Sequence, residues 1–305
     1  MKTMTKLQKS LIILSVFFIL VSFFFVYKTN EKEKILLQQQ EALYQKELAL
    51  EQQTKASLDS LELLAKAVSV YDLTSNKKIY GKNDDMIMPW ASLVKTMTII
   101  VALENNQNKE IIISKNTESG AQGDFLKKDE IWDLSDLAKF TLVLSSNGGA
   151  EALAQTDSYF LNKMNQKALQ MGLLNTKFLN VTGLDLQENQ AGAYGTASEA
   201  NQLAIYAFKK YPEIFGDTVL KNMSLESKSN FVHNIENTNL IIDKIPNILF
   251  SKTGFTNLAG GNLTIIFTNA NRHDIAISVL GSTMTGRFVD MEKIINTLYN
   301  LEYDI

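Results

Sequence analysis

The chain has 305 residues, of which 45% are hydrophobic and 21% are charged, and its formal net charge is −3 at pH 7. This is the composition of a globular protein with a sizeable core, and the lack of a basic excess argues against nucleic acid as a partner. There is no cysteine, and His233 and His273 are the only histidines. Disulfides and thiolate nucleophiles are therefore excluded, and a zinc hydrolase, which usually needs two or three histidines, is disfavoured.

An apolar run near the N-terminus predicts a membrane anchor. Residues 11–27 carry no charge, and three lysines precede them. A helix of this length spans about 26 Å, which lies within the range that crosses a bilayer. The alternative is a cleaved signal peptide, but residues 23–28 offer no small-residue cleavage site. We therefore expect an uncleaved, single-pass signal anchor over residues 1–30.

The following segment, residues 31–66, predicts a helical stalk. It contains no proline or glycine and is rich in Glu, Gln, Lys, Leu and Ala, which favour helix. Leu36, Leu43 and Leu50 recur every seven residues, but the partner positions of this heptad are polar. The pattern predicts at most a weak coiled-coil dimer, and the alternative is a solvated single stalk about 50 Å long.

Residues 67–305 carry the pattern of one α+β domain. Two short strand patterns at 68–72 and 78–80 flank a polar turn and predict a β-hairpin. A mostly helical stretch follows from 90 to 211, and strand patterns return at 248–252, 263–267 and 275–279 before a closing helix over 285–301. Strands at both ends of a helical centre predict an antiparallel sheet flanked by helices.

A serine and a lysine stand three residues apart where Pro89 opens a helical stretch, at Ser92 and Lys95. This spacing places both side chains on one face of a helix, where the lysine amine can take the serine proton. The stretch from Ser75 to Lys78 matches the same pattern, but it lies in the predicted turn, where serine is expected for its hydrogen bonds. We interpret Ser75 as structural.

Two further motifs contain residue types that can bind a peptide. Ser145 and Asn147 form an S-x-N motif ahead of two glycines, which mark a tight loop; a second match lies at 114–116. The alternative for this loop is a helix–helix turn with capping residues. The K-T-G motif of Lys252, Thr253 and Gly254 occurs once, where a predicted strand ends. Its lysine and hydroxyl can hold a carboxylate and its glycine allows close approach of a substrate backbone, although the stretch also fits a plain strand end.

The order S-x-x-K, S-x-N, K-T-G resembles that of the active-site serine penicillin-binding proteins and β-lactamases. Residues 89–95 are similar to the P-x-A-S-x-x-K of the D-alanyl-D-alanine carboxypeptidases, and so are four further stretches, at 171–178, 180–185, 237–240 and 252–256. The resemblance covers most of residues 67–305 and implies a serine β-lactamase/DD-peptidase-like fold. The sequence departs from the family pattern at Val94, Gly148 and Gly195, where threonine, aspartate and serine are usual.

The resemblance implies a serine-type D-Ala-D-Ala carboxypeptidase that removes the terminal D-alanine from peptidoglycan stem peptides. Ser92 would attack the peptide carbonyl and become acylated, Lys95 would be its general base, and Ser145 would relay a proton to the leaving nitrogen. A second cation nearby, Lys252, and partial burial would favour the neutral amine that Lys95 needs as a base. β-Lactams would be covalent inhibitors, and the catalytic domain would lie outside the cytoplasmic membrane.

The same resemblance implies the substrate contacts. Asn147 would hold the acyl-side amide, Lys252 and Thr253 would bind the terminal carboxylate, and Gly254 would let the substrate approach. The backbone N–H groups of Ser92 and Phe255 would form the oxyanion hole. No metal and no cofactor are implied.

Three alternatives compete with this interpretation. His233 or His273 would serve a Ser-His-Asp triad, but His273 lies in a hairpin turn where a solvated histidine is usual. A class A-like β-lactamase would carry an E-x-x-L-N pattern between the second and third motifs, and none occurs between Asn147 and Lys252. The departures at Val94 and Gly148 leave open a non-catalytic, wall-binding penicillin-binding protein.

Overall fold

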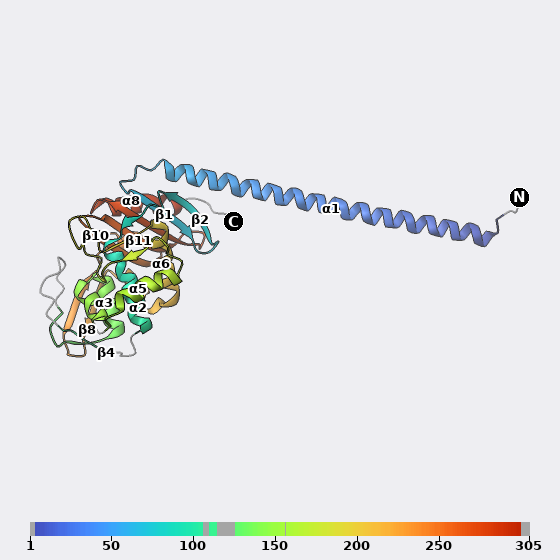
Figure 1. Ribbon diagram of the computed structural model, residues 1–305. Helices are drawn as coiled ribbons and strands as arrows, with labels where there is room; N and C mark the ends of the chain where they lie inside the picture. Colours follow the sequence, from blue (N-terminus) through green and yellow to red (C-terminus); the bar gives the residue numbers. More distant parts are fainter. Residues whose placement is uncertain (1–3, 106–109, 115–125, 156, 300–305) are drawn as a thin grey trace. The chain divides into compact units, whose positions relative to one another are not determined.

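The computed structural model describes residues 4–105, 110–114, 126–155 and 157–299 (Figure 1). Its contacts divide the chain into two compact units, an N-terminal unit that ends at Gln53 and a larger unit that begins at Thr54. The N-terminal unit consists mainly, in its described part, of the helix α1 (Lys6–Asp59), whose residues 54–59 belong to the larger unit. The apolar part of α1 is long enough to cross a membrane. The boundaries of anchor, stalk and catalytic domain at residues 30 and 66 remain predictions.

The helix expected to continue to residue 66 ends at Asp59. A carboxylate far away in the sequence binds the segment that follows the helix. The backbone N–H groups of Leu64 and Ala65 donate to the two oxygens of Asp290, at 3.0 and 2.8 Å. Asp290 thus fixes the segment between the end of α1 and the strand that begins at Ala67.

A five-stranded antiparallel sheet forms the centre of the larger unit, in the order β10-β11-β12-β1-β2. The two ends of the domain meet in it, because β1 pairs with β12 from Ala67 opposite Leu280 to Asp72 opposite Ile275. The predicted N-terminal hairpin and the three predicted C-terminal strands are confirmed. The strands are β1 (Ala67–Asp72), β2 (Lys77–Lys82), β10 (Ile248–Thr256), β11 (Gly260–Thr268) and β12 (Asp274–Ser282).

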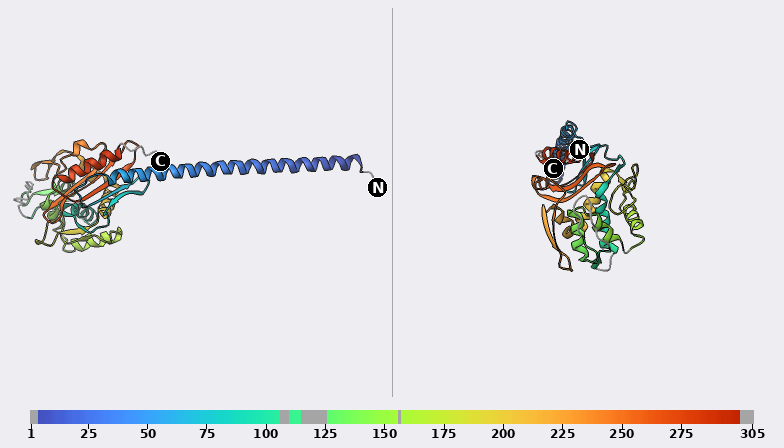
Figure 2. Two further views of the ribbon diagram at one scale, coloured as in Figure 1. Left: turned by 90° about the horizontal axis from the view of Figure 1, so that it is seen from above. Right: turned by 90° about the vertical axis from the view of Figure 1, so that its left-hand side faces the viewer.

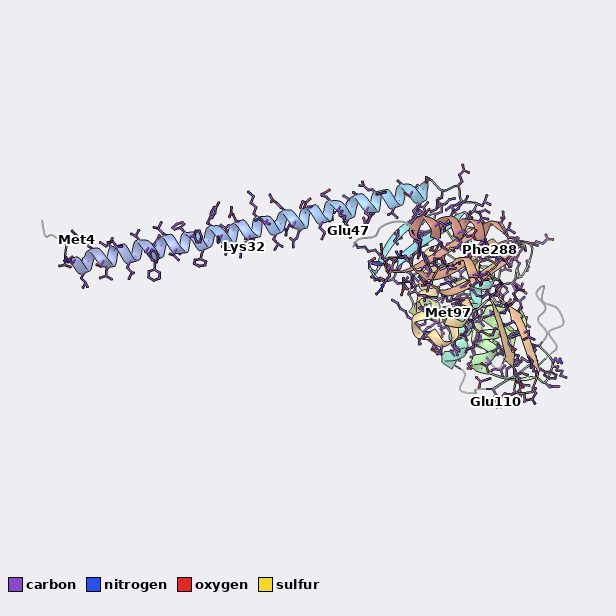
Figure 3. All side chains as sticks on the ribbon, turned by 180° about the vertical axis from the view of Figure 1, so that it is seen from behind. Met4, Lys32, Glu47, Met97, Glu110 and Phe288 are labelled. Carbon is purple, nitrogen blue, oxygen red and sulfur yellow. The ribbon has the colours of Figure 1, made fainter. Side chains whose placement is uncertain are left out.

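Each face of the sheet is buried in its own hydrophobic core. One face packs on α8 (Gly286–Tyr299), with Ile277 and Phe288 among the buried residues. The other packs on α6 (Ala197–Lys210), and its core continues into α2 (Val94–Asn105) and α3 (Leu134–Val143), with Ala276 and Met97 among the buried residues. Figures 1 and 2 show the resulting layers, and Figure 3 labels Phe288 and Met97, one in each core. The α+β fold with helices on both faces of an antiparallel sheet is confirmed.

Short elements complete the domain. Strands of two or three residues interrupt the stretch that was predicted as mostly helical, and a β-hairpin precedes β10. The sequence pattern predicted neither the short strands nor this hairpin. The closing helix predicted over 285–301 is α8, and the last two residues of that range lie outside the described residues. The remaining helices are η1 (Ala91–Leu93), α4 (Asn147–Ala154), α5 (Phe160–Gln170), α7 (Pro212–Phe215), η2 (Gly216–Val219) and η3 (Ile242–Lys244). The remaining strands form the sheets β3-β7-β6 (Met88–Pro89, Ala193–Gly195, Lys177–Phe178), β4-β5 (Glu110–Ile112, Ile131–Asp133) and β8-β9 (Asn222–Glu226, Val232–Glu236).

Candidate active site

Ser92 and Lys95 meet at the start of α2. Ser92 lies in the 3₁₀ turn η1, which runs directly into α2 at Val94, and this geometry places positions i and i+3 on one side. The Lys95 Nζ lies 2.8 Å from Ser92 Oγ, and Lys95 is fully buried. Ala91 adopts φ 48°, a left-handed conformation that is uncommon outside glycine. Strain of this kind persists where the surrounding structure holds it, as at functional sites.

Lys95 also joins two other segments to the serine. Its Nζ donates to Asn147 Oδ1 and to the carbonyl of Thr182, each at 2.8 Å. Thr182 precedes Gly183, which has φ 83° and packs so tightly that a Cβ there would lie 2.0 Å from Ala91 O. The first motif, the second motif and the 180–185 stretch therefore converge on one amine.

Ser145 faces the lysine of the third motif. The Lys252 Nζ lies 2.8 Å from Ser145 Oγ and 3.0 Å from the carbonyl of Thr253. Ser145 has φ 60°, whereas its neighbour Ser146 is the N-cap of α4 and accepts from Gly149 N at 2.7 Å. The capping role that competed with a functional one thus belongs to Ser146, and the strained Ser145 is directed to Lys252.

The K-T-G strand carries an unusual concentration of buried positive charge. Lys252 is 2% exposed, and burial, together with the nearby Lys95 and Arg287, holds its pKa well below the usual 10.5. Arg287, at the start of α8, is 8% exposed and donates from Nη1 to Gly254 O at 2.6 Å. Burial lowers the pKa of Arg287 to about 10. An anion bound here would be stabilised by these cations.

Arg287 was missed by the sequence analysis. One signal was available, because the chain has only two arginines and the other, Arg272, lies in the turn before β12. Thr238 lies in the stretch 237–240 that is similar to the family but has no role assigned from the sequence, and its Oγ1 lies 2.5 Å from Thr253 Oγ1. Arg287 and Thr238 contact the K-T-G motif from other segments of the chain, and the residues of the motif do not indicate these contacts.

Gly254 lies against the segment that carries the nucleophile. A Cβ at Gly254 would be 2.9 Å from Trp90 O and 3.1 Å from Ser92 N. A side chain at this position would therefore push β10 away from η1. The next residue, Phe255, is 38% exposed. The close packing brings the backbone of β10 beside the N–H of Ser92.

The competing sequence matches have other partners. Ser75 lies in the turn after β1 and donates from Oγ to Asp72 Oδ2 at 2.7 Å. His273 Nδ1 lies 2.7 Å from the same oxygen, and His233 Nε2 lies 2.7 Å from Glu130 Oε1. The second S-x-N match, 114–116, extends outside the described residues.

A cavity of about 830 Å³ lies elsewhere in the domain, between β1, α5 and α6. Tyr71, Lys167, Asn201 and Tyr206 are among its lining residues, and it shares none with the three motifs. The motif cluster, and not this cavity, contains the serine–lysine pair that nucleophilic chemistry requires.

An antiparallel sheet covered by helices, with a serine–lysine pair beside a second lysine–serine pair, defines the class of active-site serine enzymes that recognise penicillin and D-alanyl peptides. Residues 51–284 match the model of the D-alanyl-D-alanine carboxypeptidase family, peptidase family S11, and the chain belongs to this family. It is thus a member of the serine DD-peptidases, hydrolases that act on peptidoglycan.

Relatives carry two activities in their names. The D-alanyl-D-alanine endopeptidase of Pseudomonas aeruginosa is 31% identical over 230 residues, 72% of each chain. The D-alanyl-D-alanine carboxypeptidase DacF of Bacillus subtilis is 27% identical over 248 residues, 77% of this chain and 62% of DacF. Penicillin-binding protein D2 of Listeria monocytogenes, solved in its ampicillin-bound form, is 26% identical to this chain, and the two structures match with a TM-score of 0.68. The match covers 78% of this chain and 98% of the Listeria chain.

Proposed function

We propose that the chain is a membrane-anchored D-Ala-D-Ala carboxypeptidase that removes the terminal D-alanine of peptidoglycan stem peptides through an acyl-enzyme on Ser92. The observation that carries this proposal is the 2.8 Å contact between Lys95 Nζ and Ser92 Oγ, beside the buried cations Lys252 and Arg287. The Ser92–Lys95 pair supplies a nucleophile and its general base. The two cations supply a site for the carboxylate that a peptide ending in D-alanine presents.

Acylation proceeds from this geometry in two steps. Ser92 Oγ attacks the carbonyl carbon while its proton passes to the neutral Lys95 amine, and the oxyanion is held by the N–H groups of Ser92 and Phe255. Each such donor is worth about 2.7–4 kcal/mol. The C–N bond then breaks, and the proton reaches the leaving nitrogen through Ser145, whose hydroxyl is bonded to Lys252. Water hydrolyses the ester and restores Ser92.

The hydrogen bonds within the site indicate which atoms remain available to bind the substrate. Asn147 Oδ1 accepts from Lys95, so its Nδ2 is the donor left for the acyl-side carbonyl of the substrate. Thr253 and Lys252 bind the terminal carboxylate, and Arg287, held on Gly254 O, adds positive charge next to it. Gly254 has no side chain and so keeps β10 close to the segment that carries Ser92.

The test is release of D-alanine from an acylated peptide ending in D-Ala-D-Ala, with the purified wild-type chain and with Ser92→Ala. D-Alanine release by the wild type alone supports the proposal. Equal release by both proteins assigns the activity to another group and rejects Ser92.

Endopeptidase activity is a second candidate. The named endopeptidases of P. aeruginosa, Escherichia coli and Haemophilus influenzae are 31%, 30% and 32% identical to this chain. Both reactions form the same acyl-enzyme and differ in the leaving amine, which is free D-alanine in one and the side-chain amine of a second peptide in the other. Comparing D-alanine release with cleavage of a cross-linked muropeptide dimer under the same conditions distinguishes them.

The proposal includes the placement of the chain. The apolar part of α1 would anchor it in the membrane over residues 1–30, and residues 31–66 would act as a stalk with a catalytic domain over 67–305 outside the cell membrane. Protease added to spheroplasts should digest the domain while a cytoplasmic control survives; protection of both contradicts this topology. Chemical cross-linking through the stalk tests the weak dimer.

A further inference from the structure

Thr238 is held rigidly beside the K-T-G strand. It lies between two buried asparagines in the segment that leads from β9 to η3. The backbone N–H of Asn239 donates to Asn237 Oδ1 at 2.9 Å, and Asn239 Nδ2 donates to Ser251 Oγ at 3.0 Å. Ser251 stands two residues before Thr253 on β10, so this contact fixes the segment to the strand that carries Thr253.

The other end of the segment is fixed in the same way. Asn237 Nδ2 donates to the carbonyls of Thr218 and Leu220, at 2.7 and 3.0 Å. Thr218 Oγ1 in turn accepts from Ser251 N at 3.0 Å. With both flanks bound, the Thr238 backbone has little freedom to move away from Thr253.

The 2.5 Å between Thr238 Oγ1 and Thr253 Oγ1 leaves room for one hydrogen atom. A hydroxyl has one hydrogen to donate, whereas a carboxylate only accepts. If Thr253 donated to Thr238, it would present only lone pairs to a substrate carboxylate. If Thr238 donates to Thr253, the Thr253 hydrogen is free for the substrate, and the two bonds polarise each other.

We propose that Thr238 is a positioning residue for carboxylate recognition: its hydroxyl donates to Thr253 Oγ1 and so directs the Thr253 hydrogen to the free carboxylate of the leaving group. This rests on the proposed function, because it assigns to Thr253 the carboxylate of the substrate. Thr238 thereby determines preference for substrates that end in a free carboxylate, and it acts through Thr253 without taking part in bond breaking.

The experiment uses two acyl-D-alanyl thioesters that differ only in whether the thiol leaving group ends in a free carboxylate or in its methyl ester. The measured quantity is the ratio of their kcat/KM values. Thr238→Val removes the hydroxyl and keeps the shape, so the ratio should fall roughly tenfold, as expected for one hydrogen bond. Thr238→Ser keeps the hydroxyl and should restore the ratio to within about threefold of wild type.

Two controls separate positioning from folding. Thermal unfolding of each variant reports its stability, and a general loss of fold lowers both kcat/KM values together without changing their ratio. In a Thr253→Val background, Thr238→Val should cause no further fall in the ratio. An unchanged ratio in Thr238→Val, a loss in Thr238→Ser equal to that in Thr238→Val, or an additive fall in the double variant overturns the proposal. Failure of the wild type with both thioesters would instead reject the proposed function, and the role of Thr238 with it.

Discussion

Gly195 packs directly against the indole of Trp90. A Cβ at Gly195 would lie 2.5 Å from Trp90 Cζ2 and 2.7 Å from Thr176 Oγ1, and Trp90 is fully buried. Trp90 occupies the variable position of P-x-A-S-x-x-K, while Gly195 replaces the serine usual in the family. The bulky residue at one position therefore accounts for the missing side chain at the other, and this departure is an adjustment of packing next to Ser92.

Gly195→Ser is accordingly expected to destabilise the domain by about 1–3 kcal/mol, the usual cost of overpacking a rigid core. Gly216→Ser is the matched control, because no neighbouring group lies within 4 Å of a Cβ there. Denaturant unfolding of both variants measures the difference in the free energy of unfolding. Equal effects at the two positions would show that Trp90 yields easily and that the packing argument is wrong.

Ser92, and not Ser75, is expected to carry the penicillin adduct. Ser92 Oγ lies 2.8 Å from the Lys95 Nζ, whereas Ser75 donates to the carboxylate of Asp72. Peptide mapping by mass spectrometry after labelling should find the adduct on the peptide that contains Ser92. Ser92→Ala should lose it and Ser75→Ala should keep it; an adduct that survives Ser92→Ala would locate the nucleophile elsewhere.

Lys252→Met should change how stability depends on pH. The pKa of Lys252 is lowered by burial and then by Lys95 and Arg287, so between that pKa and 10.5 the folded protein binds fewer protons than the unfolded chain. The free energy of unfolding of the wild type therefore rises with pH across this window and falls as pH decreases towards the folded pKa. Methionine has a similar length and no charge, so the variant lacks this contribution.

The expected result is a stability difference, variant minus wild type, that is largest at the acidic end of the measured range and declines as pH rises towards 10.5. Denaturant unfolding from pH 6 to 10 measures it. Lys177→Met, at an exposed position, is the control and should show no such decline. If the stability difference for Lys252→Met stayed constant with pH, the pKa of Lys252 would be the same in the folded and unfolded states, and the argument would be wrong.

The central sheet could be predicted because its strands carry their own signal. The runs at 263–267 and 275–279 are apolar and β-branched, and both become central strands buried on two faces. The Ser92–Lys95 contact could be predicted because it depends on helix geometry alone. By contrast, β3 and β6 have two residues each, and such strands exist only through their pairing with β7.

The parts of the site that could not be predicted depend on distant contacts. Arg287 reaches Gly254 because α8 packs on the sheet, and nothing near the K-T-G motif indicates this. The choice between Ser145 and Ser146 depends on a backbone angle, the left-handed φ of Ser145. The position of Leu64 and Ala65 after α1 depends on Asp290, more than two hundred residues further along the chain.

Release of bound penicillin is expected to be slow, which separates a DD-peptidase from a β-lactamase. The ring-opened drug leaves an ester on Ser92, and the 147–252 interval lacks the E-x-x-L-N glutamate that would activate water. The backbone at Thr182 and Gly183 packs against Lys95 and Ala91 on the nucleophile's flank. Without a general base for this water, a rate acceleration of typically 10²–10⁴-fold is missing.

A release rate on the order of 10⁻³ per second corresponds to an activation barrier of about 22 kcal/mol, whereas roughly 10² per second corresponds to about 15 kcal/mol. This gap of about 7 kcal/mol is easily resolved. Labelled protein freed of excess drug should keep its adduct for minutes, as followed by intact mass; many turnovers per second would identify a β-lactamase instead.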